Sequence, residues 1–354
     1  MKRLLFMIKT EILATGSSLP FHTIALLSPI LFFLVFAGQL DKDISFPIRF
    51  NTTNTPFYQS IDHYRSPAGT PYYSEQDNNR NFIFLTETEP LKVINNKLSG
   101  SINQRIESID KNITKNYRNR LTGAISNFFY TQFPERALQI SETSLYGKDP
   151  SWASFFAASI LMFGILLSGL LFGTLSFTRE WELNSIDLLK LSPMNPLYIL
   201  SGKFLGSLIK SIITIVLYII FVTLKLKILI FNSPEIIGII CLAYFNAIII
   251  GMLIGIALKQ SLVAFITSLI SSILLWVLGG GFGTSVGMTK WIQMMININP
   301  ISKYMKLALH SCFNGPTSLM DIIYPVIILI VSVFFLYLKY YKEIYKPQFT
   351  SVKY

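Results

Sequence analysis

One motif in the chain has the residue types of a catalytic nucleophile. Residues 283–287 read Gly-Thr-Ser-Val-Gly, which matches the G-x-S-x-G pattern of serine hydrolases, and His310 or His22 could serve as the base. The pattern needs a strand before the serine, whereas an apolar helical run and three glycines precede it here. We therefore keep an intramembrane serine protease as a remote alternative and favour a glycine-rich break at the end of a membrane span.

A second set of polar residues occupies a short segment between two long apolar runs. Thr178 can cap a helix whose first turn holds Glu180 and Glu182, because carboxylates suit the positive end of a helix. Pro193 and Pro196 end this helix, since proline cannot continue the hydrogen-bond ladder. The spacing therefore predicts a short helix near 179–191 that lies parallel to the membrane.

The predicted helix is amphipathic, with Leu183, Ile186 and Leu189 on one face. One interpretation is a helix that rests on lipid headgroups, and the other is a helix that docks in a groove of a partner protein. The acidic residues of the segment favour the partner, because anionic lipids would repel them.

The elements that position this segment are membrane spans. The chain has 354 residues, of which 51% are hydrophobic and only 14% charged, against about 25% charged in ordinary soluble domains. About 20 apolar residues in a helix cross the hydrocarbon core of a bilayer. The runs that reach or approach this length are 19–40, 152–177, 204–224, 236–258, 261–278 and 322–338. The net charge of +11 fits basic membrane flanks rather than nucleic-acid binding.

Between the first two spans lies a polar segment, 41–150, which is long enough to be a folded domain. Residues 46–50 and 82–85 read as strands, and 51–56 as a turn that caps a short helix. From Leu98 to Phe133, apolar residues recur at three- and four-residue steps, which predicts one or two amphipathic helices. The chain then divides into a first span at 1–40, a small α+β domain at 41–150 and five further spans at 151–354.

Lysine and arginine mark the cytoplasmic ends of spans. They gather at the N-terminus, after the second span and at the C-terminus, and six spans put these three segments on one side. Both termini are then cytoplasmic, and 41–150 lies outside. Five lysines on the outer side depart from this pattern: Lys225, Lys227, Lys290, Lys303 and Lys306.

Two charges lie at or inside spans. Lys210 is expected to extend its ammonium to the nearer membrane surface. Asp321 is expected at the interface, beside the start of the last span, rather than buried.

The segment 179–203 resembles the loop of type-2 ATP-binding-cassette (ABC) exporter permeases. That family reads approximately Arg-Glu-x-Glu-x-Gly-Thr, then leucines, Thr/Ser-Pro, a second proline, and Gly-Lys entering the next span. The matching residues are Arg179, Glu180, Glu182, Ser185, Leu188, Leu189, Ser192, Pro193, Pro196, Gly202 and Lys203. Leu183-Asn184 stand where the family has Arg-Gly. Residues 145–150 and 299–304 resemble two further family segments, and the span layout matches over the whole length.

The resemblance implies a permease half without its own ATPase. The chain agrees, because it has no G-x-x-x-x-G-K-[ST] loop. The implied partners are a cytoplasmic ABC ATPase, which holds ATP and Mg²⁺, and a second permease copy or sister permease, since a half-transporter must dimerise to enclose a pathway. The residues that would couple to the ATPase are Arg179, Glu180, Glu182, Leu183, Ser185, Ile186, Leu188, Leu189, Pro193, Pro196, Gly202 and Lys203.

Taken together, the sequence predicts an all-α polytopic membrane domain of six helices with a small α+β extracytoplasmic domain. We expect a permease of the bacterial inner membrane in contact with lipid, with no nucleic-acid partner. We expect no cofactor or metal on the chain, because Cys241 and Cys312 form no CxxC pair and no metal-ligand cluster.

The alternatives are a membrane receptor, which would need a cytoplasmic output domain, and a structural component of an envelope assembly. The spans carry almost no charge, which suits an amphipathic or lipid-like substrate.

The orientation gives a first test. In intact cells, a Ser60→Cys variant should react with a membrane-impermeant thiol reagent and a Ser351→Cys variant should not, because only the domain at 41–150 is placed outside. Reaction at position 351 without reaction at position 60 would reverse the orientation.

Overall fold

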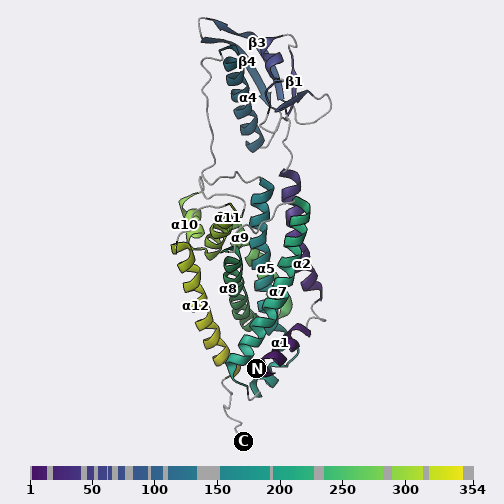
Figure 1. The fold of residues 1–354 in the computed structure, drawn as a ribbon, viewed down its shortest axis with the longest axis vertical. Coiled ribbons are helices and arrows are strands. Elements are labelled where there is room, and N and C mark those ends of the chain that lie inside the picture. The colour runs from purple at the N-terminus through teal and green to yellow at the C-terminus, as the bar shows by residue number, and fades with distance from the viewer. Residues whose placement is uncertain are drawn as a thin grey trace. The chain divides into compact units, whose positions relative to one another are not determined.

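The computed structural model of the chain (Figure 1) describes residues 2–13, 19–40, 46–51, 55–61, 63–65, 71–75, 83–94, 97–106, 111–133, 152–191, 194–226, 235–281, 289–313 and 319–345. Contacts divide the chain into two compact units. The first unit is Met1–Asp41 with Ser144–Tyr354, and the second is Lys42–Thr143.

The first unit is a bundle of helices. Among the described residues, six helices are long and apolar enough to cross a membrane: α2 (Leu19–Leu40), α5 (Trp152–Glu182), α7 (Pro196–Leu226), α8 (Glu235–Leu258), α9 (Ser261–Leu278) and α12 (Leu319–Tyr340). The prediction of six spans is therefore confirmed. The shorter helices are α1 (Lys2–Leu13), α6 (Ile186–Leu191), α10 (Lys290–Ile298), α11 (Pro300–Phe313) and the π-helix η3 (Tyr341–Tyr345).

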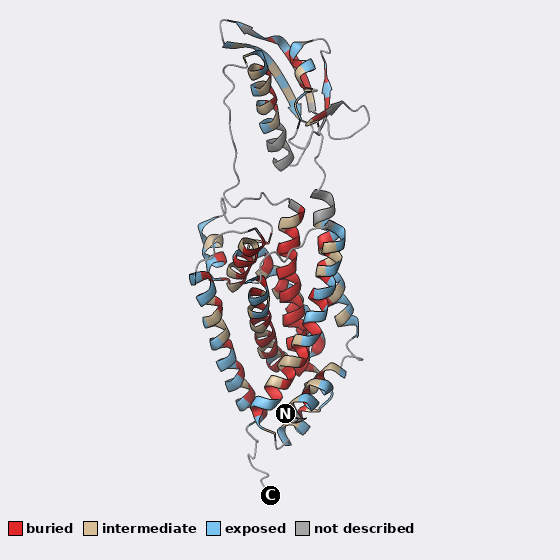
Figure 2. Cartoon of the chain, viewed as in Figure 1, coloured by how far each residue is buried: buried red, intermediate tan, exposed pale blue. Residues whose placement is uncertain are grey.

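Helix α5 is the centre of the bundle. In its most apolar stretch, 94% of the residues are buried (Figure 2). The helix packs against α2, α7, α8 and α9. Small residues let α8 approach closely, because a Cβ on Gly173 would lie 2.4 Å from the carbonyl oxygen of Ile248 and 3.1 Å from the Cα of Gly251. Inside a membrane, lipid tails are as apolar as the helix surfaces, so the hydrophobic effect does not drive helices together. Close van der Waals packing therefore stabilises the α5–α8 pair.

The second unit is a small α+β domain. Its sheet has the strand order β2-β1-β3-β4. The elements are β1 (Phe46–Phe50), α3 (Pro56–Ile61), β2 (Tyr73–Glu75), β3 (Ile83–Ile94), β4 (Lys97–Ile106) and α4 (Lys111–Gln132). β1 runs parallel to β2 and β3, whereas β3 and β4 are antiparallel. Phe57, Leu85 and Phe128 are buried between the helices and the sheet, and the predicted fold class is confirmed.

The prediction of helix from Leu98 to Phe133 is wrong in its first part, because residues 97–106 form strand β4. Leu98, Ile102 and Ile106 are four residues apart, and a four-residue step is close to one helical turn but is also two full periods of a strand. The ladder to β3 decides between them, since it pairs Leu98 with Val93 and Ile106 with Ile83.

Two charges are more buried in the protein than predicted. The ammonium of Lys210 lies 2.7 Å from the carboxylate of Glu11, and its side chain is 7% exposed. Asp321 is buried within the protein, contrary to the expectation, and it pairs with Lys303 and Lys306. In both cases the partner comes from a helix outside the spans, which the hydropathy pattern does not reveal.

The α5–α8 contact can be tested with two glycines. We expect Gly173→Ala to lower the free energy of unfolding by about 1–3 kcal/mol, because the new Cβ would meet backbone atoms that cannot move aside easily. Gly238→Ala in α8 is the matched control. A Cβ there has no neighbour within 4 Å, so the change should be neutral or stabilise by up to about 1 kcal/mol. Thermal unfolding in detergent measures both, and equal shifts would contradict the packing account.

Candidate functional site

The segment 179–191 does not form one helix. Thr178 lies inside α5 and donates its hydroxyl to the carbonyl oxygen of Thr174 at 3.2 Å, so it caps no helix start. Glu180 and Glu182 belong to the last turn of α5, and α6 begins at Ile186. Carboxylates are unfavourable at the negative end of a helix unless other groups compensate them. Both find such groups in neighbouring helices, and this lets α5 continue past the predicted start.

The turn between α5 and α6 depends on Asn184. Its φ of 54° lies in the left-handed region, which asparagine tolerates better than most residues other than glycine. Asparagine therefore supplies the conformation for which the resembled family has glycine at this position. Ser185 follows and donates its hydroxyl to the carboxylate of Glu180, which closes the turn onto α5.

The ammonium of Lys203, near the start of α7, is the centre of a buried cluster of charges. It donates to Glu180 Oε1 at 2.7 Å, to the carbonyl oxygen of Ser176 at 2.7 Å and to Glu11 Oε2 at 3.3 Å. An ammonium has three donors, and all three are used. The residue is 1% exposed, and a charge is stable at such a depth only when it is paired and hydrogen-bonded.

Glu11 links a second lysine to the cluster. Its Oε1 lies 2.7 Å from the ammonium of Lys210. Lys210 lies about two turns beyond Lys203 on α7. The two lysines and the carboxylates of Glu11 and Glu180 balance to zero net charge. Three helices meet here, because α1 supplies Glu11, α5 supplies Glu180 and Ser176, and α7 supplies both lysines.

Two glycines of α7 make room for α1. A Cβ on Gly202 would lie 2.5 Å from the Cβ of Met7, and one on Gly206 would lie 2.5 Å from the Cγ of Glu11. The Gly-Lys pair of the sequence motif therefore has two structural roles. Because Gly202 has no side chain, α1 can approach α7 closely. Lys203 binds the carboxylate of Glu11 in α1.

Glu182 ties α5 to the start of α9. Its Oε1 accepts the backbone N–H of Ser261 at 2.6 Å, and its Oε2 accepts the hydroxyl of Ser261 at 2.6 Å. A carboxylate at the first residues of a helix satisfies a free N–H and suits the helix dipole. The end of α5 is thus bonded to α7 through Glu180 and to α9 through Glu182.

Trp181 lies between two cations. Lys190 of α6 is 5.6 Å and Lys259 4.5 Å from the centre of its ring. Lys259 joins α8 to α9 and lies 3.8 Å from Glu343 of η3, and α6 itself contacts η3. The short helix α6 is therefore held against the end of α5 and against η3.

The two faces of α6 differ from the prediction. Ile186 is 3% exposed and Leu189 is half-buried, and both pack against the core of the bundle. The exposed apolar residues are Leu183, Leu188 and Leu191, with exposed fractions of 67%, 70% and 81%. The prediction of one apolar docking face was wrong, because Ile186 and Leu189 anchor the helix from inside while Leu188 and Leu191 point away.

The remaining motif residues have separate positions. Arg179 is half-buried in the last turn of α5, and Pro196 is the first residue of α7, where Asn195 caps the helix by accepting the N–H of Leu197 at 2.9 Å. Pro193 lies outside the described residues. So do residues 283–287, and the described element before them is helix α9, not the strand that a nucleophile elbow needs.

Sequence reasoning missed Glu11, Lys210 and Ser261 as members of this cluster. One signal was present, because Glu11 is the only acidic residue among the first 40 and Lys210 is the only charge inside its apolar run. A lone acid and a lone base in otherwise apolar segments are a candidate pair. Nothing comparable marked Ser261.

In the comparison with known protein families, the model of the family described as ABC-2 family transporter protein matches residues 21–338. No curated protein matches the chain, and neither does any solved structure.

The charge cluster predicts a large effect for Glu11. Glu11→Ala should lower the free energy of unfolding by about 3–5 kcal/mol, because it leaves two buried ammonium groups short of a carboxylate. Lys190→Ala is the control. Its pair with Asp187 is exposed, so its loss should cost at most about 1 kcal/mol. Unfolding midpoints in detergent compare the two, and a Glu11 variant as stable as the control would show that the cluster does not stabilise the bundle.

Proposed function

The chain belongs to the ABC-2 transporter family, and from this we propose that it is the permease of an exporter whose ATP hydrolysis takes place on a separate subunit. It is a multi-pass membrane protein and a permease subunit of an ABC transporter. We place the end of the bundle that carries α6 in the cytoplasm, together with both termini, in a bacterial inner membrane. ATP and Mg²⁺ then bind the partner ATPase rather than this chain.

The observation that carries the proposal is the two-sided construction of the segment around α6. On its inner side, Glu180 bonds Lys203 of α7 and Glu182 bonds Ser261 of α9. On its outer side, Leu188 and Leu191 expose apolar surface away from the bundle. Helix α6 is held inward by Ile186 and Leu189, follows directly on the bonded end of α5, and exposes apolar side chains outward, which suits a groove in a partner protein.

Movement of the partner at α6 would then reach the spans directly. Hydrogen bonds with an ionised donor or acceptor are about twice as strong as neutral ones, so the contacts of Glu180 and Glu182 can transmit a displacement without breaking. Through Lys203, the same movement reaches Glu11 and helix α1. We infer that closing of the ATPase shifts α1, α7 and α9 together.

A pathway for substrate is best placed between two permease chains. Helix α5 fills the centre of the bundle, and 94% of the residues in its most apolar stretch are buried, so the spans of one chain pack around a helix and not around a channel. A second copy or a sister permease would complete the transporter. The nearly uncharged spans suit an amphipathic substrate.

The docking role is tested at the exposed leucines. Replacing Leu188 and Leu191 by Asp should abolish co-purification of the ATPase subunit, because buried apolar anchors at interfaces contribute about 2 kcal/mol or more each. The control replaces the same two residues by Met, which keeps the apolar surface and should keep the subunit. Both variants must reach the membrane at equal levels. Undiminished co-purification with the Asp variant would remove the docking role from α6. Leu189→Asp is unsuitable, since Leu189 packs inward.

A further inference from the structure

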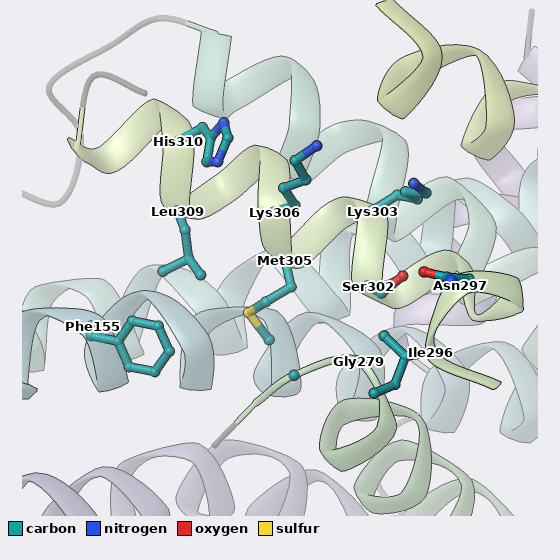
Figure 3. Close-up of a pocket in the computed structure, with 11 residues that line it drawn as sticks. Phe155, Gly279, Ile296, Asn297, Ser302, Lys303, Met305, Lys306, Leu309 and His310 are labelled. Carbon is teal, nitrogen blue, oxygen red and sulfur yellow. The ribbon is translucent and has the colours of Figure 1, made fainter. Parts of the chain in front are cut away.

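A cavity lies at the opposite ends of α5 and α9 from the charge cluster. It has a volume of about 420 Å³ and lies among the first turns of α5, the glycines after α9, and helices α10 and α11 (Figure 3). Figure 1 shows α10 and α11 gathered at the end of the bundle away from the termini. This cavity shares no residue with the segment around α6.

The walls of the cavity are of two kinds. Met305 and Leu309 extend from α11 toward Phe155 of α5 and form an apolar floor (Figure 3). Lys303, Lys306 and His310 follow one another along the adjacent stripe of α11, because residues three and four apart share a helix face. The cavity is therefore apolar at depth and basic at its rim.

The rim carries more positive than negative charge. Asp321 of α12 binds Lys303 through Oδ1 at 3.1 Å and Lys306 through Oδ2 at 2.6 Å, so one carboxylate serves two ammonium groups. The lysine side chains remain 30% and 47% exposed, whereas that of Asp321 is 4% exposed. Each ammonium has three donors and gives one to Asp321, which leaves donors and a net positive charge facing the cavity.

Helix α10 places the cavity near the membrane surface. Trp291, Met294 and Ile298 lie on one face of it and are 64%, 64% and 58% exposed, while Ile296 points inward and lines the cavity. An exposed apolar face that begins with Lys290 and Trp291 is typical of a helix at the boundary between headgroups and acyl chains. An acyl chain can therefore reach the apolar floor from the bilayer while its headgroup remains at the rim.

We propose that this cavity binds an anionic amphiphile of the membrane, with a phosphate-type headgroup at Lys303 and Lys306 and its apolar part against Met305, Leu309 and Phe155. Lysine binds phosphate as a point charge, and two lysines on one helix face attract one headgroup together. A zwitterionic headgroup carries its own cation, so its attraction to the two lysines is weaker. The inference goes beyond the proposed function, because binding requires neither the ATPase nor transport.

The test is a titration of the purified full chain in a nonionic detergent by calorimetry. The probes are dioctanoyl phosphatidic acid, dioctanoyl phosphatidylcholine and inorganic phosphate. We expect phosphatidic acid to bind one site per chain, at least about tenfold tighter than either other probe. Inorganic phosphate binding as tightly as phosphatidic acid would overturn the amphiphile and indicate a site for free phosphate. Phosphatidylcholine binding as tightly would overturn the role of the lysines.

Matched variants locate the site. Lys306→Gln should weaken phosphatidic acid at least about tenfold, the loss expected for one hydrogen bond to a charged group. Lys303 stays paired with Asp321 in this variant, so the buried carboxylate keeps a partner. Lys290→Gln removes an exposed lysine of α10 outside the cavity and should leave affinity unchanged, and Lys306→Arg should restore it. Equal losses in Lys306→Gln and Lys290→Gln would show general attraction to a basic surface and overturn the proposal.

Discussion

The ammonium group of Lys203 is buried beside the start of α7, and most of the arrangement around α6 follows from the need to neutralise it. Its three donors go to Glu11, to Glu180 and to a carbonyl of α5. An unpaired charge at this depth would be far more costly than any single apolar contact in the bundle. The last turn of α5 and the position of α1 are therefore held by one group. Glu11 in turn neutralises Lys210, so the cost of burying both lysines is offset together.

The two ends of the bundle differ in how their charged groups are balanced and how far they are exposed. Around Lys203, two lysines and two carboxylates balance, all but the half-buried Glu180 are buried, and their bonds connect helices. Around Asp321, one buried carboxylate faces two lysines that remain partly exposed to a cavity. A balanced and buried cluster has no capacity left for a ligand and serves to transmit force between helices. An unbalanced and accessible one attracts anions. Helix α5 spans the distance between the two ends and is buried nearly throughout, so neither site depends on a flexible connection.

The spans and the family were predictable from the sequence because both depend on local properties. The length of an apolar run decides whether a helix crosses a bilayer, and the motif at 179–203 is continuous in the chain. The errors arose where neighbours in space decide the outcome. Leu98, Ile102 and Ile106 fit a helix or a strand until β3 pairs with them. Thr178 was predicted to be a helix cap, yet α5 continues beyond it, because Lys203 and Ser261 donate hydrogen bonds to the carboxylates of its last turn.

By itself, the sequence predicted six helices long and apolar enough to cross a membrane, as the described residues show, a small α+β domain after the first span, and a loop after the second span with the residues of an ABC permease. The tertiary structure decided which of those loop residues face inward. Ile186 is buried and Leu189 half-buried, Leu188 and Leu191 are exposed, and Glu180 and Glu182 are bound to other helices. It also decided that Glu11 binds a lysine 192 positions away. The physical reason is that apolar burial in a membrane follows from composition along the chain, whereas a buried charge is stabilised only by the particular groups that folding brings within hydrogen-bond distance.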